Sequence, residues 1–285
     1  MSTSYRELWQ SLLPHYDERE ARAVVLWLLD VAFSLSRTSV VCGAVEQLQG
    51  AELQRLQAMM GRLQRGEPVQ YVAGLADFGP RQFAVSPSVL IPRPETYELC
   101  QWIVAEAGGR EGTELRLLDI GTGSGCIACT LALDLPGSEV LACDISTEAL
   151  SVARANAQRL GATVAFQQMD ILQAAAAEVT LSLIVSNPPY ICEHQRAAMD
   201  AHVTDHEPSM ALFVPDSDPL RFYRAIARYG LQALKPGGQL YLELDADHAA
   251  ATAQLLSATG YDGVELRNDQ FGRPRFARCH TRRHS

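Results

Sequence analysis

Hydrophobic residues near the start of the chain recur every three to four positions, which is the spacing of amphipathic helices. The pattern predicts helices over residues 5–13, from Asp17 onward, and over 44–65. Asp17 suits an N-cap, and Glu20 stands three positions later as in a capping box. We expect residues 1–68 to form a small helical bundle that either docks a substrate or has a purely structural role.

The hydrophobic pattern changes after Pro68, which ends the third predicted helix. Residues 69–72 and 77–85 form short apolar stretches of extended character, and the turn at Gly79-Pro80 separates two of them. We therefore expect residues 69–92 to form a β-hairpin linker.

From residue 93 to residue 285 strand patterns alternate with helix patterns, as in a parallel sheet with crossover helices. The predicted strands cover 115–120, 140–143, 162–167, 181–185, 239–244, 264–267 and 275–279. The predicted helices cover 95–107, 126–133, 147–160, 220–234 and 246–258. The fold class is therefore α/β, with a doubly wound, seven-stranded, Rossmann-like sheet.

Composition and charge narrow the class of protein. The 285 residues suffice for one α/β domain and an appendage, and no stretch resembles a signal peptide or a membrane span. We expect a soluble, cytoplasmic protein. The net charge of −9 argues against a nucleic-acid binder, although basic residues gather at 273–283. An acidic enzyme acting on a basic protein fits this balance better.

Two patterns superficially suggest metal ligands. Cys126 and Cys129 form a C-x-x-C, but no second pair completes a zinc site, and small buried side chains explain them better. His202 and His206 lie four apart beside Glu207, but Pro208 interrupts any helix there. We expect no metal site.

A glycine-rich loop, residues 121–125, follows the first strand of the predicted sheet. Its glycines permit a tight turn and the close approach of a ligand, and the next helix offers free N–H groups. Asp144 ends the second strand, where an acid can bind two ribose hydroxyls, and Asp170 is a candidate for the adenine end of a cofactor. Asp119 suits a cofactor with an ammonium group. A glycine-rich turn in another doubly wound enzyme remains the alternative.

The strand at 181–185 runs into Ser186-Asn187-Pro188-Pro189-Tyr190. Two prolines cannot continue a sheet ladder, and each holds the preceding residue extended. Because ligands sit at the carboxyl ends of parallel strands, this corner presents an amide, a carbonyl and an aromatic face to a pocket. The alternative is a proline-rich turn that only ends the strand.

A second stiff segment covers residues 90–96, Leu-Ile-Pro-Arg-Pro-Glu-Thr. Its two prolines flank Arg93 and would fix Arg93 and Glu95 in place. Equally, Pro92 and Pro94 could simply start the helix at 95–107.

The glycine loop, the ribose acid and Asn-Pro-Pro-Tyr, in this order, resemble the class I methyltransferases that alkylate planar exocyclic nitrogen. Residues 66–71, 90–96 and 206–208 further resemble the PrmC (HemK) family of glutamine-N5 methyltransferases, which modify the Gly-Gly-Gln motif of peptide chain release factors. The resemblance implies S-adenosyl-L-methionine as cofactor and release factors as protein substrates. It implies that the protein is a monomer and that it contacts neither nucleic acid nor membrane directly.

The resemblance also implies roles for particular residues. The Asn187 side-chain oxygen and the Pro188 carbonyl would accept the two N–H bonds of the substrate amide, and Tyr190 would stack on the amide plane. The implied substrate-binding residues are Arg93, Glu95, Asn187, Pro188, Pro189 and Tyr190. The implied cofactor-binding residues are Asp119, Gly121, Thr122, Gly123, Ser124, Gly125, Asp144, Ile145, Asp170, Ile171 and Asn187.

The chain departs from the family pattern at Tyr97, Ile171 and Asp245, which affects the cofactor's surroundings more than the reaction. Three alternatives remain open. The first is a glutamine-N5 methyltransferase that acts on a large-subunit ribosomal protein. The second is a DNA N6-adenine or cytosine methyltransferase, which would need to flip a base. The third is a non-catalytic scaffold that binds S-adenosylmethionine.

Overall fold

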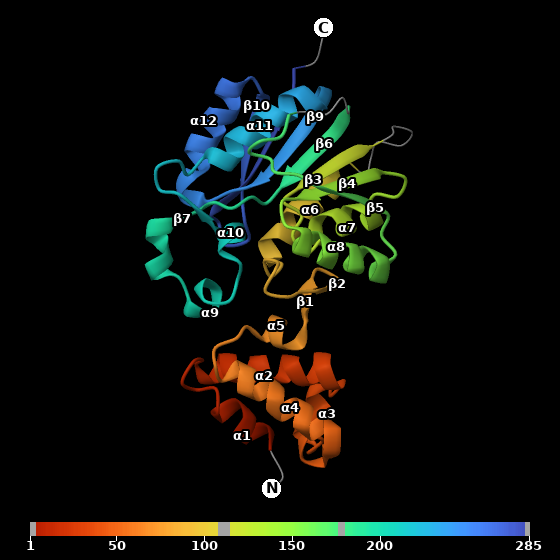
Figure 1. Ribbon diagram of the computed structural model, residues 1–285, viewed down its shortest axis with the longest axis vertical. Helices are drawn as coiled ribbons and strands as arrows, with labels where there is room; N and C mark the ends of the chain where they lie inside the picture. The colour runs from red at the N-terminus through yellow and green to blue at the C-terminus, as the bar shows by residue number, and fades with distance from the viewer. Residues whose placement is uncertain (1–3, 108–114, 176–179, 283–285) are drawn as a thin grey trace. The chain divides into compact units, whose positions relative to one another are not determined.

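The computed structural model describes residues 4–107, 115–175 and 180–282 (Figure 1). The chain forms two compact units, Met1–Ala76 with Asp200–His206, and Asp77–Met199 with Glu207–Ser285. The division falls inside strand β1 (Leu75–Phe78), and a later segment belongs to the first unit. That segment is held there by His202, whose ring stacks on Tyr16 with centroids 4.7 Å apart.

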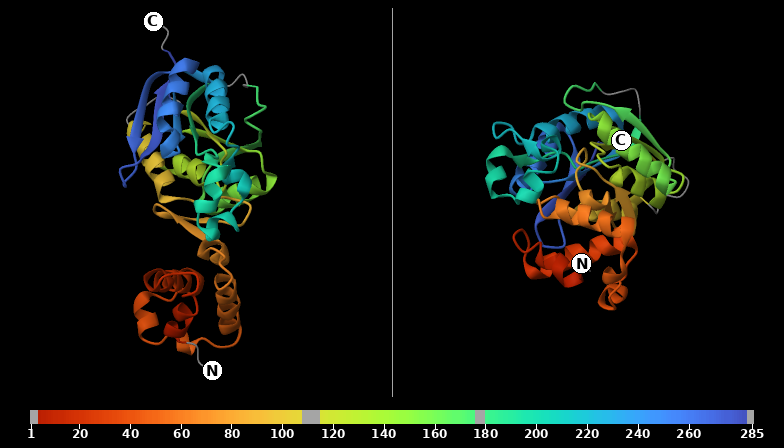
Figure 2. Two further views of the ribbon diagram at one scale, coloured as in Figure 1. Left: turned by 90° about the vertical axis from the view of Figure 1, so that its left-hand side faces the viewer. Right: turned by 60° about the horizontal axis from the view of Figure 1, so that its bottom comes forward.

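The first unit is helical, as predicted (Figure 2). Its helices are α1 (Tyr5–Gln10), α2 (Glu18–Phe33), α3 (Arg37–Val41), α4 (Gly50–Leu63), α5 (Val69–Ala73) and α9 (Ala201–Thr204), with a 3-10 turn η1 (Val45–Gln47). Asp17 caps α2 by accepting a hydrogen bond from the Glu20 N–H. Helix α3 was not predicted, and the helix expected over 44–65 is divided before Gly50, whose φ of 56° favours glycine.

The extended conformation expected for residues 69–72 is wrong, because these residues belong to helix α5. The Arg62 guanidinium donates hydrogen bonds to the carbonyls of Tyr71 and Val72, which satisfies the end of this short helix. The hairpin itself is present, with β1 (Leu75–Phe78) and β2 (Arg81–Ala84) joined at Gly79.

The second unit contains the predicted seven-stranded sheet, in the order β10-β11-β9-β6-β3-β4-β5. The strands are β3 (Arg116–Ile120), β4 (Glu139–Asp144), β5 (Val164–Gln168), β6 (Leu181–Ser186), β9 (Leu234–Glu243), β10 (Asp262–Asn268) and β11 (Pro274–His280). Neighbouring strands are parallel except that β11 is antiparallel to both of its neighbours. Strand β9 starts before the turn expected at 235–238.

Helices cover both faces of this sheet (Figures 1 and 2). One face packs against α6 (Pro94–Ala107), α7 (Cys126–Asp134) and α8 (Thr147–Leu160), and the other against α11 (Arg221–Ala233) and α12 (Ala249–Thr259). Strand β6 is buried along its whole length. The winding direction reverses between β3 and β6, so the carboxyl ends of these two strands flank the place where such sheets bind ligands.

Short elements complete the second unit. They are β7 (Ile191–Cys192), η2 (Glu193–Ala198), α10 (Ser209–Leu212), β8 (Phe213–Val214) and η3 (Ala246–His248). Strands β7 and β8 form a separate parallel pair. Within the described ranges, none of the helices has the length and apolar character needed to cross a bilayer.

Candidate active site

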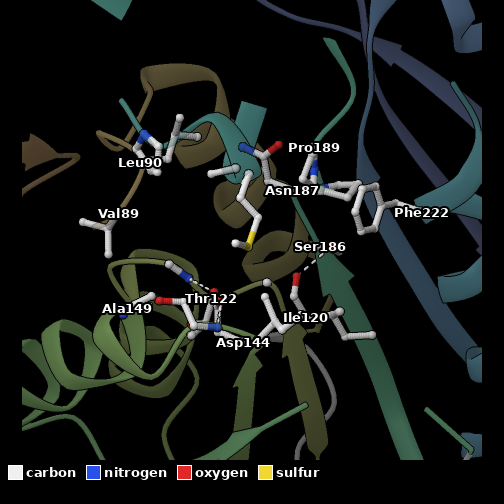
Figure 3. A pocket seen from close by; sticks show the side chains of 18 of the residues that line it. Val89, Leu90, Ile120, Thr122, Asp144, Ala149, Ser186, Asn187, Pro189 and Phe222 are labelled. Carbon is white, nitrogen blue, oxygen red and sulfur yellow. Dashed lines mark hydrogen bonds between the residues drawn. The ribbon is translucent and has the colours of Figure 1, made fainter. Parts of the chain in front are cut away.

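A cavity of about 540 Å³ opens at the carboxyl ends of β3, β4 and β6 (Figure 3). Asn187 lies across it from Thr122 and Asp144. The predicted site residues that line it are Arg93, Gly121, Thr122, Gly123, Ser124, Asp144, Ile145, Asp170, Ile171, Asn187, Pro188 and Pro189. The predicted site residues outside the lining are Glu95, Asp119, Gly125 and Tyr190. The glycine loop and the Asn-Pro-Pro corner therefore share one cavity.

The glycine loop needs its glycines. Gly121, Gly123 and Gly125 have φ values of 74°, 54° and 80°, which L side chains rarely adopt. A Cβ on Gly125 would also lie 3.1 Å from the Cβ of Ala153 in α8. Gly125 therefore shapes the loop without reaching the cavity.

Two acids hold the loops around the cavity. Asp144, at the end of β4, accepts hydrogen bonds from the N–H groups of Gly123 and Ser146, at 2.9 and 3.0 Å. Asp170 accepts from the Leu172 N–H at 2.9 Å and from the Gln173 side chain at 2.7 Å. Because each carboxylate has about four acceptor positions, both keep acceptor capacity toward the cavity.

Asp119 lies beneath the glycine loop and is almost fully buried. Its Oδ2 accepts hydrogen bonds from the Thr122 hydroxyl and the Ala128 N–H, while its buried Oδ1 has no partner among the described residues. Burial raises the pKa of Asp119 to about 7, an effect that these two hydrogen bonds oppose and the charge of Asp144 reinforces. A cationic group above the loop would stabilise the ionised form.

Replacing Asp119 by Asn should make stability less dependent on pH. Because the folded-state pKa is raised above the ordinary value, folding favours the protonated form, and the stability this gives is lost as pH rises toward about 7. Between about pH 5 and pH 8 the wild type should lose on the order of 2 kcal/mol more than Asp119→Asn. Urea unfolding at both pH values measures this, and equal losses in the two proteins would refute the expectation.

The Asn187 side chain is held by α6. Its Nδ2 donates a hydrogen bond to the Thr96 hydroxyl at 3.1 Å, and that hydroxyl donates to Glu243 Oε2 at 2.6 Å. Thr96 and Glu243 are both buried, and burial raises the pKa of Glu243 to about 7. Asn187 is thus the cavity end of a chain of polar groups.

Tyr190 lies outside the cavity lining, next to the strand end that carries Asn187. Its hydroxyl donates to Glu243 Oε1 at 3.2 Å, and its ring packs with the core between the sheet and helices α11 and α12. Burial, and secondarily the charge of Glu243, raise the pKa of Tyr190. Tyr190 is half-buried and lies outside the cavity lining, and its stacking on a substrate amide stays a prediction.

Four supporting side chains were missed as site residues, namely Thr96, Asn156, Glu207 and Glu243. Thr96 and Glu207 stand inside motifs noted above, but the motifs did not indicate what these side chains bind. Glu207 accepts from the Ile91 N–H at 3.1 Å and pairs with Arg93, which joins residues 206–208 to residues 90–96. Asn156 of α8 donates to the carbonyl of Ser124 at 2.9 Å and so ties down the glycine loop. The sequence carries no signal for Asn156.

The remaining candidates have structural explanations. Cys126 and Cys129 are buried free thiols, as predicted, and Pro94 begins helix α6. The Tyr97 ring packs edge-to-face on Phe78 with centroids 5.3 Å apart, and Asp245 caps η3. In the basic tail, Arg275 pairs with Asp269, and Arg278 with Glu106 and Glu265.

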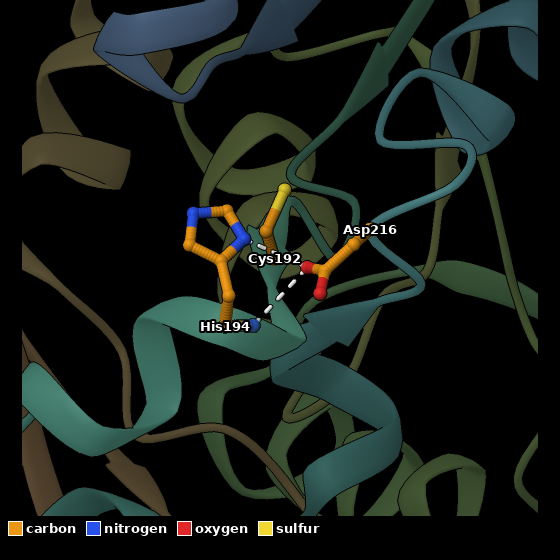
Figure 4. A group of neighbouring side chains, drawn as sticks. All are labelled: Cys192, His194 and Asp216. Atoms are coloured by element: carbon orange, nitrogen blue, oxygen red, sulfur yellow. Dashed lines mark hydrogen bonds and ion pairs between the residues drawn. The ribbon is translucent and has the colours of Figure 1, made fainter.

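One side-chain group outside the cavity was not foreseen (Figure 4). Cys192, His194 and Asp216 place possible ligand atoms within 4.8 Å of one another. The His194 and Asp216 side chains are largely exposed and bond to each other at 2.8 Å. That hydrogen bond satisfies both groups and accounts for the arrangement.

Comparison with known proteins agrees with this geometry. Residues 106–206 match the family described as the Methyltransferase small domain, and residues 6–74 match the PrmC N-terminal domain. Solved structures share the fold at low identity. The hMettl16 catalytic domain has a TM-score of 0.57 at 18% identity, covering 78% of this chain and 82% of that one. The fold and site therefore define a methyltransferase of the Rossmann-like class.

Curated relatives narrow the class to a family. The release factor glutamine methyltransferase of Bacteroides thetaiotaomicron is 42% identical over 267 residues, covering 93% of this chain and 95% of the relative. That of Flavobacterium psychrophilum is 35% identical and covers 96% of each chain. The chain belongs to the release factor glutamine methyltransferase family.

Proposed function

We propose that this chain transfers a methyl group from S-adenosyl-L-methionine to the side-chain amide nitrogen, N5, of the glutamine in the Gly-Gly-Gln motif of peptide chain release factors. The observation that carries the proposal is the placement of Asn187-Pro188 in one cavity with the glycine loop, in a chain that matches release factor glutamine methyltransferases along almost its whole length. Since release factors act in translation, we place the reaction in the cytoplasm.

The cavity residues fit this cofactor, as does Asp119, which lies outside the lining and beneath the glycine loop. The unpartnered, buried Oδ1 of Asp119 suits a nearby ammonium group, and Asp144 keeps acceptor capacity for ribose hydroxyls. Asp170 and Ile171 would border the adenine. When bound, S-adenosylmethionine supplies a methyl group activated by a positively charged sulfonium. Gly121 and Gly123 line the cavity without side chains, so the loop would let the cofactor approach closely at these two positions.

The chain's own residues would make the amide nitrogen reactive by orienting it. An amide lone pair is delocalised into the carbonyl, so geometry matters more than basicity. The Oδ1 of Asn187 and the carbonyl of Pro188 would each accept one N–H bond of the glutamine amide, leaving the nitrogen lone pair directed at the methyl donor. The nitrogen gains the methyl group and loses one proton to water, so no strong base is required.

Arg93 and Arg221 are the arginines that line the cavity, and we assign Arg93 the role of guiding a substrate. Its side chain lines the cavity and is anchored by the buried carboxylate of Glu207. A charge fixed in this way would position the substrate's backbone rather than take part in the reaction. Glu95 lies outside the cavity lining, and we assign it no contact with substrate.

The test is methyl transfer by the purified protein with labelled cofactor. Three substrates are offered side by side: a release factor, a large-subunit ribosomal protein and duplex DNA. We expect label only in the release factor, and mass spectrometry should place a single methyl on the glutamine of Gly-Gly-Gln. Label in the ribosomal protein or the DNA alone, or in none of the three, would refute the proposal.

A further inference from the structure

A chain of buried hydrogen bonds runs from the cavity into the protein behind Asn187. It joins Asn187 Nδ2 to the Thr96 hydroxyl at 3.1 Å, and that hydroxyl to Glu243 Oε2 at 2.6 Å. The other carboxylate oxygen, Oε1, accepts from the Tyr190 hydroxyl at 3.2 Å. Thr96 and Glu243 are 3% and 2% exposed, so water does not compete for these groups.

The chemistry of these groups fixes the direction of every bond. Burial raises the pKa of Glu243 to about 7, and above that pH its ionised carboxylate only accepts, so both hydroxyls that reach it must donate to it. A hydroxyl has a single proton, and Thr96, having given its proton to Glu243, can only accept from Asn187. The group of Asn187 that faces Thr96 must therefore be its NH₂. Arg275, which can only donate, lies 3.5 Å from the Tyr190 oxygen and agrees with this direction.

This direction leaves Asn187 Oδ1 as the free end of the carboxamide. None of the described residues donates a hydrogen bond to that atom, and Asn187 lines the cavity. The two ends of an asparagine amide have almost the same shape. Without the chain of bonds, a half-turn of the carboxamide would present NH₂ to the cavity instead of Oδ1. An NH₂ group facing the substrate amide nitrogen would place two hydrogen-bond donors next to each other, and neither could accept from the other.

We propose that Thr96 and Glu243 are positioning residues that hold the Asn187 carboxamide with Oδ1 toward the substrate. The inference rests on the proposed function, because it assumes that the ligand is a carboxamide with two N–H donors. It also gives the site a means of rejecting a glutamate side chain, whose oxygens would meet the fixed acceptor without a proton between them.

The test compares Thr96→Val with Thr96→Ser at about pH 8, where Glu243 is ionised. Valine keeps the shape and removes the hydroxyl, while serine keeps the hydroxyl. We expect kcat to fall about 10- to 100-fold in Thr96→Val, and Thr96→Ser to recover most of that loss. Thr252→Val is the matched control, since the buried Thr252 hydroxyl on α12 has no hydrogen-bond partner among the described residues.

Repeating the comparison in the Asn187→Asp variant separates a loss of Asn187 orientation from general structural damage. In Asn187→Asp the side chain ends in two equivalent oxygens, so it presents an acceptor whichever way it turns. The loss caused by Thr96→Val should therefore shrink to about twofold or less in the Asn187→Asp background. Thr96→Ala, which also lacks the hydroxyl, replaces Thr96→Val in the same comparison if the valine variant does not fold.

The outcomes are distinct. Unchanged kcat in Thr96→Val, equal damage in the valine and serine variants, or an equal loss in the wild-type and Asn187→Asp backgrounds would each overturn the positioning role. All are measured against a wild type that methylates a release factor. A wild type that methylates none refutes the proposed function instead.

Discussion

Asn187→Ala should reduce kcat by at least about 10²-fold while leaving the affinity for S-adenosylmethionine largely intact. The substitution removes the acceptor that would hold one N–H bond of the substrate amide, and with it the orientation of the nitrogen. The residues proposed to hold the cofactor lie mainly at the ends of β3, β4 and β5 and keep their contacts. Single-turnover methylation of a release factor and calorimetric titration of the cofactor measure the two effects separately.

Asn268→Ala is the matched control for this experiment, because Asn268 is exposed on β10. It should leave both kcat and cofactor affinity unchanged. Turnover in Asn187→Ala within about threefold of wild type would show that the Asn187 side chain does not orient the reacting group.

Asp144→Ala should weaken the binding of S-adenosylmethionine about 100-fold. The carboxylate accepts hydrogen bonds from the N–H groups of Gly123 and Ser146, so its removal loosens the glycine loop and leaves both donors without a protein partner. In the proposed complex it also loses the acceptor for the ribose hydroxyls. The expected signature is a raised KM for the cofactor, with kcat partly restored at high cofactor concentration.

Glu139→Ala provides the control for Asp144→Ala on the same strand. Glu139 begins β4, at the opposite end from Asp144, and is exposed in an ion pair with Arg116. Such pairs contribute little, so cofactor binding should not change. A dissociation constant for Asp144→Ala close to that of Glu139→Ala would rule out a cofactor contact at Asp144.

The sheet could be predicted from the sequence because its local signals agree with one another. Strand β6 is mostly apolar and is followed after Asn187 by two prolines, and α8 was predicted with the bounds that the structure gives it. Signals conflicted at residues 69–72, where β-branched residues favoured an extended chain. In the structure Arg62 donates hydrogen bonds to the carbonyls at the end of α5, and these tertiary contacts favour the helix over the extended chain.

The glycine loop and the Asn-Pro-Pro corner of the cavity were predictable, but the groups that hold them were not. Strand order brings the ends of β3, β4 and β6 together, so Asp144 and Asn187 could be placed from topology alone. Thr96, Asn156 and Glu243 act through hydrogen bonds to residues 32 to 147 positions away, and no local pattern reports such partners. The hydrogen bond from the Tyr190 hydroxyl to Glu243 has no local sequence signal either.

The most direct test of the central claim is a crystal structure of the protein with a Gly-Gly-Gln peptide and the demethylated cofactor product. The account predicts the glutamine amide nitrogen at hydrogen-bonding distance, about 3 Å, from both Asn187 Oδ1 and the carbonyl of Pro188. A glutamine bound elsewhere, or an Asn187 that turns its NH₂ toward the peptide, would contradict the account.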